Sequence, residues 1–304
     1  MTSWTKFNKE TEKVGLIGCG RMGMCMLDSL LAAGFTVVGY DKFPAAAEAA
    51  VARGAEKADT PKALAEKASL ILLSLPGPLQ LEEVIFGENG LSEALTPAHI
   101  VVDTSTVDPK TTIGISERLA EKGAAYLDSP ILGRPSATGK WMLPTGGDSA
   151  ALERAKPALL TFAANAISVG GSGAGNALKL LNQMMFSCIN AISSEVMAIC
   201  DHVGIDKEMF YRTVAGSSAA TVSGLFREVG RVIVENDYDA PAFTVDLLIK
   251  DTKLALQMAK DSDAPSLITG TVQMFNELAH AQGLGNQDTS ALFKVFSQHY
   301  TDLG

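Results

Sequence analysis

A glycine pattern near the start of the chain could bind a dinucleotide. The stretch GLIGCGRMG spaces Gly18, Gly20 and Gly23 as G-x-G-x-x-G. Gly18 would allow a tight turn, Gly20 would let the backbone approach a pyrophosphate, and Gly23 would let a helix pack on a strand. The N-terminus of that helix would offer unpaired N–H groups to the anion. The pattern is weak alone, so it requires a strand before it and a helix after it.

An acidic residue follows at a suitable distance. Asp41 stands 18 residues after Gly23, and its carboxylate could accept hydrogen bonds from ribose hydroxyls. The same charge would repel a 2′-phosphate, so the sequence favours NAD over NADP, although the neighbouring Lys42 could soften this discrimination. The alternative is an ordinary strand–helix turn with a solvated Asp41.

A second polar group lies in an apolar stretch of the second half. In GSGAGNALKLLNQ, Lys179, Asn182 and Gln183 fall on one side of a helix, at positions i, i+3 and i+4. Burial lowers the pKa of a lysine, which suits a general acid/base that interconverts a hydroxyl and a carbonyl. Asn182 and Gln183 would then hold the substrate. The helix alone equally allows a lysine that reaches the surface or pairs with an acid such as Glu195.

Alternating strands and helices would position the glycine pattern. Apolar runs predict strands over residues 13–18, 36–41, 69–76, 99–106 and 124–130. Helices are predicted over residues 21–33, 44–53 and 108–121. Asp108-Pro109 would begin the last of these, and Gly34 would end the first. This alternation predicts an α/β fold with a doubly wound, parallel Rossmann sheet that is covered on both faces.

The second half is predicted to be helical. Strand signals end near residue 172. A long helix is predicted over residues 174–203, and shorter ones near residues 206–214, 242–263, 265–282 and 288–299. We therefore predict a dinucleotide-binding Rossmann domain over residues 1–172. An all-helical domain over residues 173–304 would begin with the long interdomain helix and would serve substrate binding and oligomer formation.

Composition excludes several classes of protein. A net charge of −9 argues against a partner such as nucleic acid or an anionic membrane. No stretch is expected to be long and apolar enough to span a bilayer, and residues 1–13 do not resemble a signal peptide. The four cysteines fit free thiols in a reducing, cytoplasmic compartment. No metal site is expected, because the histidines are scattered at His99, His202, His280 and His299.

Five motifs in one order resemble the β-hydroxyacid dehydrogenases. They are GLIGCGRMG, DTST (103–106), DSPILGRPSATGKWMLPTGG (128–147), GSGAGNALKLLNQ and KDTKLALQMA (250–259). The resemblance covers essentially the whole chain and implies NAD-dependent chemistry on small 3-hydroxy acids, in homodimers or homotetramers. The family signature G-x-G-x-x-x-K-x-x-N-N implies that Lys179 is the catalytic residue.

The resemblance also implies roles for residues that the patterns alone do not single out. Arg21 and Met22 would lie in the cofactor turn, and Leu75 and Thr106 would line the path of the cofactor. Lys250 would reach the active site from a later helix. Alternatively, Leu75 belongs to the core, and Lys250 is a surface partner of Asp246 or Asp251.

Two departures from the family pattern affect the predicted substrate. The family's Ser-Gly-Gly is Leu132-Gly133-Arg134 here. Arg134 could bind a carboxylate or sulfonate bidentately, or it could face solvent or form a structural ion pair. The Gly133-Arg134 pair also resembles the sulfolactaldehyde reductase branch. Gln183 replaces an asparagine, which would reshape the pocket. Trp141 replaces a residue that is usually small, and we expect it to serve packing.

We therefore predict an NAD-dependent dehydrogenase, with NADP possible. It would transfer a hydride between the cofactor and a small anionic 3-hydroxy acid bound between the domains. Alternatives are a reductase for a sulfonated or carboxylated semialdehyde such as sulfolactaldehyde or succinic semialdehyde, an imine reductase, and a non-catalytic nucleotide sensor. The retained Lys179 and glycine pattern count against the last two.

Overall fold

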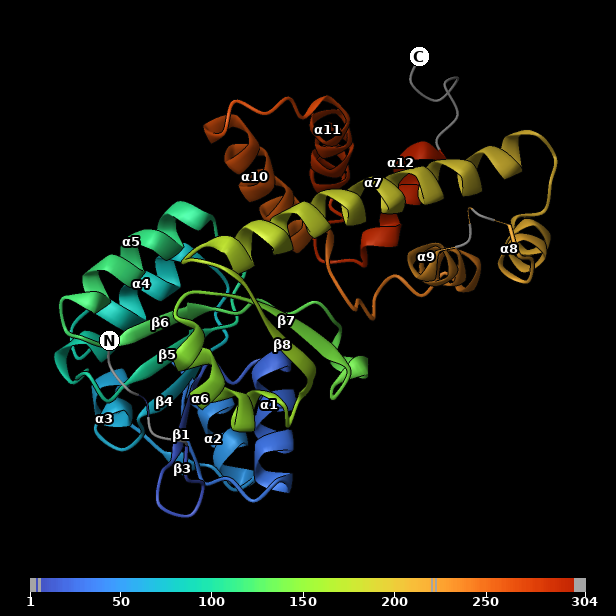
Figure 1. Cartoon of the computed structure of the whole chain (residues 1–304). Coiled ribbons are helices and arrows are strands. Elements are labelled where there is room, and N and C mark those ends of the chain that lie inside the picture. Colours follow the sequence, from blue (N-terminus) through green and yellow to red (C-terminus); the bar gives the residue numbers. More distant parts are fainter. Residues whose placement is uncertain (1–3, 5–6, 220, 222, 298–304) are drawn as a thin grey trace. The chain divides into compact units, whose positions relative to one another are not determined.

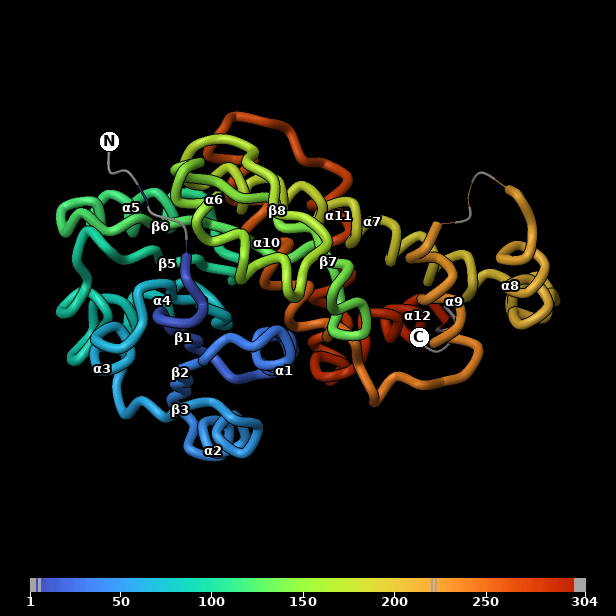
Figure 2. The backbone as a smooth tube through the Cα atoms, turned by 60° about the horizontal axis from the view of Figure 1, so that its bottom comes forward, coloured from blue at the N-terminus to red at the C-terminus, as the bar shows by residue number. Residues whose placement is uncertain are grey.

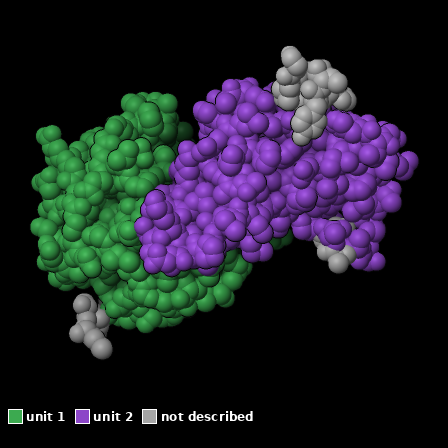
Figure 3. All heavy atoms as spheres, turned by 90° about the horizontal axis from the view of Figure 1, so that it is seen from above, with its two compact units in different colours: residues 1–179 green, residues 180–304 purple. Residues whose placement is uncertain are grey.

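The protein consists of two compact units. The computed structural model describes residue 4, residues 7–219, residue 221 and residues 223–297. Residues 1–179 and residues 180–304 form the units coloured in Figure 3. The division falls within the longest helix, α7 (Ala174–His202), whereas the sequence places a domain boundary after residue 172.

Unit 1 is built on an eight-stranded sheet with the order β3-β2-β1-β4-β5-β6-β7-β8 (Figure 1). Its strands are β1 (Val14–Ile17), β2 (Val37–Tyr40), β3 (Glu56–Lys57), β4 (Leu70–Leu73), β5 (Ile100–Asp103), β6 (Ala125–Asp128), β7 (Trp141–Gly146) and β8 (Ala163–Gly170). Only β6 and β7 pair antiparallel. The predicted Rossmann sheet is confirmed, and β3, β7 and β8 extend it.

Helices cover both faces of this sheet. Alternate strand residues point to opposite faces, so Leu16 packs with the α1 side chains and Ile17 with those of α4 and α5. One face carries α1 (Arg21–Ala32) and α6 (Ser149–Leu159); the other carries α3 (Pro61–Ala65), α4 (Pro78–Phe86) and α5 (Pro109–Ala120). The remaining elements are α2 (Pro44–Ala52), η1 (Leu91–Glu93) and η2 (Pro135–Ala137). Two-sided burial explains why the central strands are apolar throughout.

The helix boundaries follow the predicted signals. Asp108 caps α5 by accepting the backbone N–H of Thr111 at 2.9 Å, and Pro109 is the first helical residue. Gly34, with φ +82°, follows α1 in the left-handed conformation. These local signals fix where each helix leaves or meets its strand.

Unit 2 is helical within residues 180–219, 221 and 223–297. After α7 it contains α8 (Lys207–Ala215), α9 (Gly224–Glu235), α10 (Val245–Asp261), α11 (Leu267–Ala281), η3 (Thr289–Leu292) and α12 (Phe293–Phe296). The helix α9 was not predicted, since it contains two glycines. A Cβ at Gly230 would lie 2.4 Å from the Tyr211 ring, so this glycine lets α8 and α9 pack closely. The helix predicted over residues 288–299 is two short pieces, and residues 298–299 lie outside the described chain.

The long helix α7 corrects one expectation. By length and composition alone it is long and apolar enough to cross a membrane, although no such stretch was expected. Half of its most apolar window is buried inside the protein, and a single such helix is weak evidence for a membrane span. The chain enters α7 directly from β8 (Figure 2).

Candidate active site

The glycine turn joins β1 to α1 with very close backbone approaches. A Cβ at Gly18, where φ is +93°, would lie 2.2 Å from the carbonyl oxygen of Ser74. A Cβ at Gly23 would lie 1.9 Å from the carbonyl oxygen of Gly18, so the helix could not pack here with a larger residue. A Cβ at Gly20 would meet nothing within 4 Å. Two glycines therefore make the turn, and the third borders open space.

The N-terminus of α1 faces this open space, and no side-chain cap or acidic residue of its first turn neutralises its positive dipole. Gly20 is the N-cap, no side chain caps the helix, and its first turn contains no acid. The exposed Arg21 and the half-buried Met22 begin the helix. Since its first N–H groups and its dipole favour an anion, the turn fits the pyrophosphate of a dinucleotide.

Asp41 is tied to the glycine turn by hydrogen bonds. Its carboxylate accepts the backbone N–H of Cys19 at 2.7 Å and of Phe43 at 2.8 Å. The adjacent Lys42 has its Nζ atom 2.5 Å from a carboxylate oxygen of Glu83, in α4. Burial and the charge of Asp41 raise the pKa of the Cys19 thiol to about 12. The thiol is therefore no nucleophile at neutral pH.

The strand register places the predicted cofactor residues at one edge of the sheet. Ile17 pairs with Tyr40 and Leu73, and these parallel strands end together. Beyond them lie Gly18 and Asp41, the half-buried Leu75 after β4, and the half-buried Thr106 after β5. The backbone N–H of Leu75 donates to Ser105 Oγ at 2.9 Å, which joins two of these connections. Ligands of open α/β sheets bind at this edge.

Two buried acids stand side by side at the ends of β5 and β6. Asp103 and Asp128 are register partners, and neither is exposed. Asp103 accepts the Tyr126 hydroxyl at 2.8 Å and the Ser105 N–H at 2.9 Å. Burial raises the pKa of Asp103 to about 6; those two hydrogen bonds oppose the change, and the charge of Asp128 adds to it.

Asp128 holds the first turn of α7. Its carboxylate accepts the backbone N–H of Gly173 at 2.9 Å and of Asn176 at 2.8 Å. Burial raises the pKa of Asp128, and these N–H groups oppose that change. A Cβ at Gly175 would lie 2.4 Å from the Asp128 carbonyl oxygen. The carboxylate therefore fixes the turn of α7 that precedes Lys179.

Asn176 is a second anchor of this turn and was not among the predicted site residues. The side chain is fully buried. Its oxygen accepts the Val107 N–H at 3.2 Å, and its Nδ2 donates to Thr112 Oγ1 at 3.0 Å. The sequence signal for this role was a polar amide inside an apolar motif, but the partners of Asn176 depend on the tertiary fold.

Lys179 lies against the connection that follows β6. The half-buried side chain donates from Nζ to the carbonyl oxygen of Ile131 at 2.9 Å. Gly133 and the half-buried Arg134 follow in the same connection, with Leu132 in a β-bridge to Met142. Unit 1 thus brings the predicted acid/base next to the predicted substrate loop.

Unit 2 gathers the other predicted residues around one buried acid. Gln183 Nε2 donates to Asp251 Oδ2 at 2.6 Å, and Asn182 Nδ2 donates to Gln183 Oε1 at 3.2 Å. Lys250 Nζ lies 2.9 Å from Asp251 Oδ1. Asp251 is the partner suggested for Lys250, but its side chain is only 4% exposed. Sequence reasoning missed the central place of Asp251.

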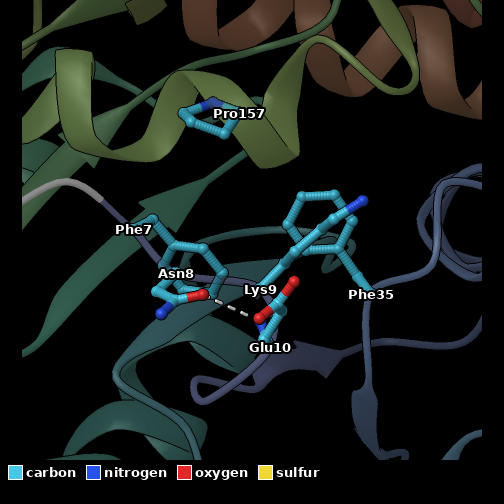
Figure 4. Close-up of a pocket in the computed structure, with 6 residues that line it drawn as sticks. All are labelled: Phe7, Asn8, Lys9, Glu10, Phe35 and Pro157. Carbon is cyan, nitrogen blue, oxygen red and sulfur yellow. Dashed lines mark hydrogen bonds between the residues drawn. The ribbon is translucent and has the colours of Figure 1, made fainter.

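A separate surface pocket lies outside this arrangement. It has a volume of about 430 Å³ and is lined by Phe7, Asn8, Lys9, Glu10, Phe35 and Pro157 (Figure 4). None of the predicted site residues contributes to it. Within residues 4, 7–219, 221 and 223–297, no group of three or more His, Cys, Asp or Glu side chains is arranged to hold a metal ion.

Comparisons with known proteins cover nearly the whole chain. Residues 13–171 match the NAD binding domain of 6-phosphogluconate dehydrogenase, and residues 173–296 match the NAD-binding family of NADP-dependent 3-hydroxyisobutyrate dehydrogenase. The 2-(hydroxymethyl)glutarate dehydrogenase of Eubacterium barkeri is 31% identical over 94% of this chain and 95% of its own. The 3-sulfolactaldehyde reductase of Escherichia coli (strain K12) is 32% identical over 92% and 94%. A 3-hydroxyisobutyrate dehydrogenase structure from Salmonella typhimurium has a TM-score of 0.85 and 28% identity over 94% and 100%.

Proposed function

Because the chain belongs to the β-hydroxyacid dehydrogenase family, we propose that it oxidises a small 3-hydroxy acid with NAD, or reduces the corresponding semialdehyde or keto acid, with Lys179 as acid/base. As a member of this family it is an NAD(P)-dependent oxidoreductase. The observation that carries the assignment to Lys179 is its half-buried position, with Nζ 2.9 Å from the Ile131 carbonyl at the start of the substrate loop.

The cofactor would be held along the carboxyl edge of the sheet. Gly18, Gly20, Arg21, Met22 and Gly23 would surround its pyrophosphate, and Asp41 would bind the adenosine ribose. Leu75, Thr106 and, from unit 2, Lys250 would contact the rest of the dinucleotide. When bound, NAD supplies the acceptor for the hydride. We propose a preference for NAD, supported by the Asp41 carboxylate and by the pairing of Lys42 with Glu83.

The residues of this chain would orient the substrate and move one proton. Neutral Lys179 would take the proton of the substrate hydroxyl during oxidation, and its ammonium would return a proton to the carbonyl during reduction. Asp128 would orient the lysine by fixing the turn before it. Asn182 would hold the hydroxyl end of the substrate, while Gln183 would order Asn182 by joining it to Asp251.

The acid group of the substrate would meet Gly133 and Arg134. A guanidinium offers parallel N–H groups that match a carboxylate or sulfonate. The second candidate function, reduction of a sulfonated or carboxylated semialdehyde, is favoured by Arg134 and by the similarity to 3-sulfolactaldehyde reductase. Both candidates use the same site, but the second works mainly in the reducing direction and extends the acid group to a sulfonate.

The wider setting of the enzyme belongs to the same proposal. We place the functional boundary between residues 172 and 173, supported by family matches that end at 171 and begin at 173. A homodimer or homotetramer is supported by half-exposed apolar side chains on α7, including Leu181, Met185, Ile192 and Ile199. Four free cysteines support a cytoplasmic location.

The test is a spectroscopic assay of nicotinamide reduction with both cofactors. The substrates are 2-(hydroxymethyl)glutarate, 3-hydroxyisobutyrate and 2,3-dihydroxypropane-1-sulfonate, the alcohol related to 3-sulfolactaldehyde. Lys179→Ala should lower kcat by roughly 100- to 10,000-fold, the usual contribution of a general acid/base. Lys122→Ala, at an exposed position, is the matched control. Lys179→Ala with full kcat would exclude the acid/base role, and absence of turnover with every substrate would contradict the proposed activity.

A further inference from the structure

The indole of Trp141 makes a specific contact with the substrate loop. Trp141 is the first residue of β7 and is fully buried. Its Nε1 donates to the backbone carbonyl oxygen of Arg134 at 2.7 Å. The ring also packs against Phe162, with centroids 6.0 Å apart and planes at 60°. The core thus holds the indole ring, and the ring's one polar atom donates its hydrogen bond to the loop.

Gly133 shows how closely the indole approaches the loop backbone. A Cβ at Gly133 would lie 2.1 Å from Trp141 Cδ1 and 2.9 Å from Nε1. The glycine is required by this approach rather than by its backbone conformation, since its φ is not in the left-handed region. The two family departures at positions 134 and 141 are therefore parts of one structure.

The neighbouring loop residues are fixed in the same way. Leu132 and Met142 exchange backbone hydrogen bonds of 2.9 and 3.2 Å. The carbonyl oxygen of Ile131 accepts the Lys179 ammonium. Each residue from 131 to 134 thus has at least one defined backbone or packing partner, and two of these partners are consecutive residues of β7. The Arg134 carbonyl oxygen also accepts the backbone N–H of Ala137 at 2.9 Å, so the indole and the η2 turn hold it together.

We propose that Trp141 is a positioning residue that sets where Arg134 meets the acid group of the substrate. The inference rests on the proposed function of Arg134 and goes beyond it by assigning the specificity device to a buried residue of β7. A bidentate guanidinium contact depends on a defined geometry. Fixing the Arg134 carbonyl and the Gly133 backbone gives the guanidinium one starting point, which reduces the conformational freedom lost on binding.

The first variant is Trp141→Phe, which keeps a buried ring and removes the indole N–H. Losing one hydrogen bond that organises a binding group should raise KM for 2,3-dihydroxypropane-1-sulfonate about five- to tenfold. We expect kcat and the Kd for NAD to change less than about twofold. Trp4→Phe, which alters the other tryptophan of the chain, is the matched control and should leave KM unchanged. An unchanged KM in Trp141→Phe would overturn the proposal.

A double-mutant comparison separates positioning from general packing. If Trp141 acts through Arg134, Trp141→Phe should add little to the KM of Arg134→Ala. An equal rise of KM in both backgrounds would mean that the indole supports the domain without positioning the guanidinium. Thermal unfolding of the four proteins checks that each is folded.

A binding experiment keeps this inference separate from the proposed activity. In Trp4→Phe, Trp141 is the sole tryptophan, so its fluorescence can be titrated with the same sulfonate without turnover. We expect a saturable change that disappears in Trp4→Phe/Arg134→Ala. A change that persists without Arg134, or the lack of any change, would overturn the link between these residues. Binding without turnover would overturn only the proposed reaction.

Discussion

The buried carboxyl of Asp103 should make the stability of unit 1 depend on pH. Its pKa is raised from the usual 3.8 to about 6, chiefly by burial. The folded protein therefore binds this proton more tightly than the unfolded chain does. The stabilisation from the protonated form is complete below the unfolded pKa and is lost as the pH rises through the folded pKa. The informative variant is Asp103→Asn, which removes the titration and keeps an acceptor for the Ser105 N–H.

The magnitude follows from the two pKa values. One pKa unit corresponds to about 1.4 kcal/mol, so the change from 3.8 to about 6 corresponds to about 3 kcal/mol in total. About 1 kcal/mol of this is already lost at pH 4.5. The unfolding free energy of the natural protein should therefore fall relative to Asp103→Asn by about 2 kcal/mol between pH 4.5 and pH 7.

Intrinsic fluorescence is a suitable assay, because both tryptophans, Trp4 and Trp141, belong to unit 1. Urea unfolding of the natural protein and Asp103→Asn is followed at several pH values, with the exposed Asp59→Asn as control. A constant offset between the proteins would report only the altered hydrogen bonds. A difference that stays flat within about 0.5 kcal/mol across this range would refute the argument, because ionisation of Asp103 would then cost no stability.

Further substitutions test the cofactor edge and the start of α7. Gly23→Ala should weaken NAD binding and lower the unfolding temperature, because its Cβ would lie 1.9 Å from the Gly18 carbonyl oxygen. Gly20→Ala should weaken NAD binding without lowering the unfolding temperature. Calorimetric titration with NAD and thermal melting curves distinguish the two outcomes. Asp41→Asn should raise the NADP-to-NAD ratio of kcat/KM about tenfold by removing one charge; an unchanged ratio argues against Asp41 as the selector. Asp128→Asn should cost about 1–3 kcal/mol of stability and lower kcat. An unchanged kcat would show that Asp128 is not needed to place Lys179.

The fold was predictable where local sequence is governed by two-sided burial. The strands β1, β4 and β5 are continuous apolar runs because helices cover both faces of the sheet. The strands β7 and β8 were not recognised, since β7 contains Pro144 and β8 has an irregular pattern of exposed and buried residues at the sheet edge. Of the two, only β8 is an edge strand, and it lacks the two apolar faces that identify a central strand.

The motifs of the candidate site were predictable, but the residues that hold those motifs in place were less so. The glycine turn and Lys179 carry sequence patterns that can be recognised one by one. Asp128 holds N–H groups that lie 45 and 48 residues further along the chain, so its role depends on where β6 and α7 meet. Trp141 was expected to serve packing, and it does pack; its donation to Arg134 could not be read from the sequence.

The connection between β6 and β7 has a consequence for how this scaffold can be altered. Asp128 holds the start of α7, and Ile131 accepts the side chain of Lys179, which is proposed for proton transfer. Residues 132–134 form the proposed acid-binding loop, and their β7 partners hold it in place. The two tasks are separated by a few positions within one loop, so new acid specificities could evolve by local exchange while the proton-transfer apparatus is inherited intact. A library that varies Leu132, Arg134 and Met142 together, with Gly133 and Trp141 kept as a pair, follows this natural division and is a rational starting point for redirecting the enzyme.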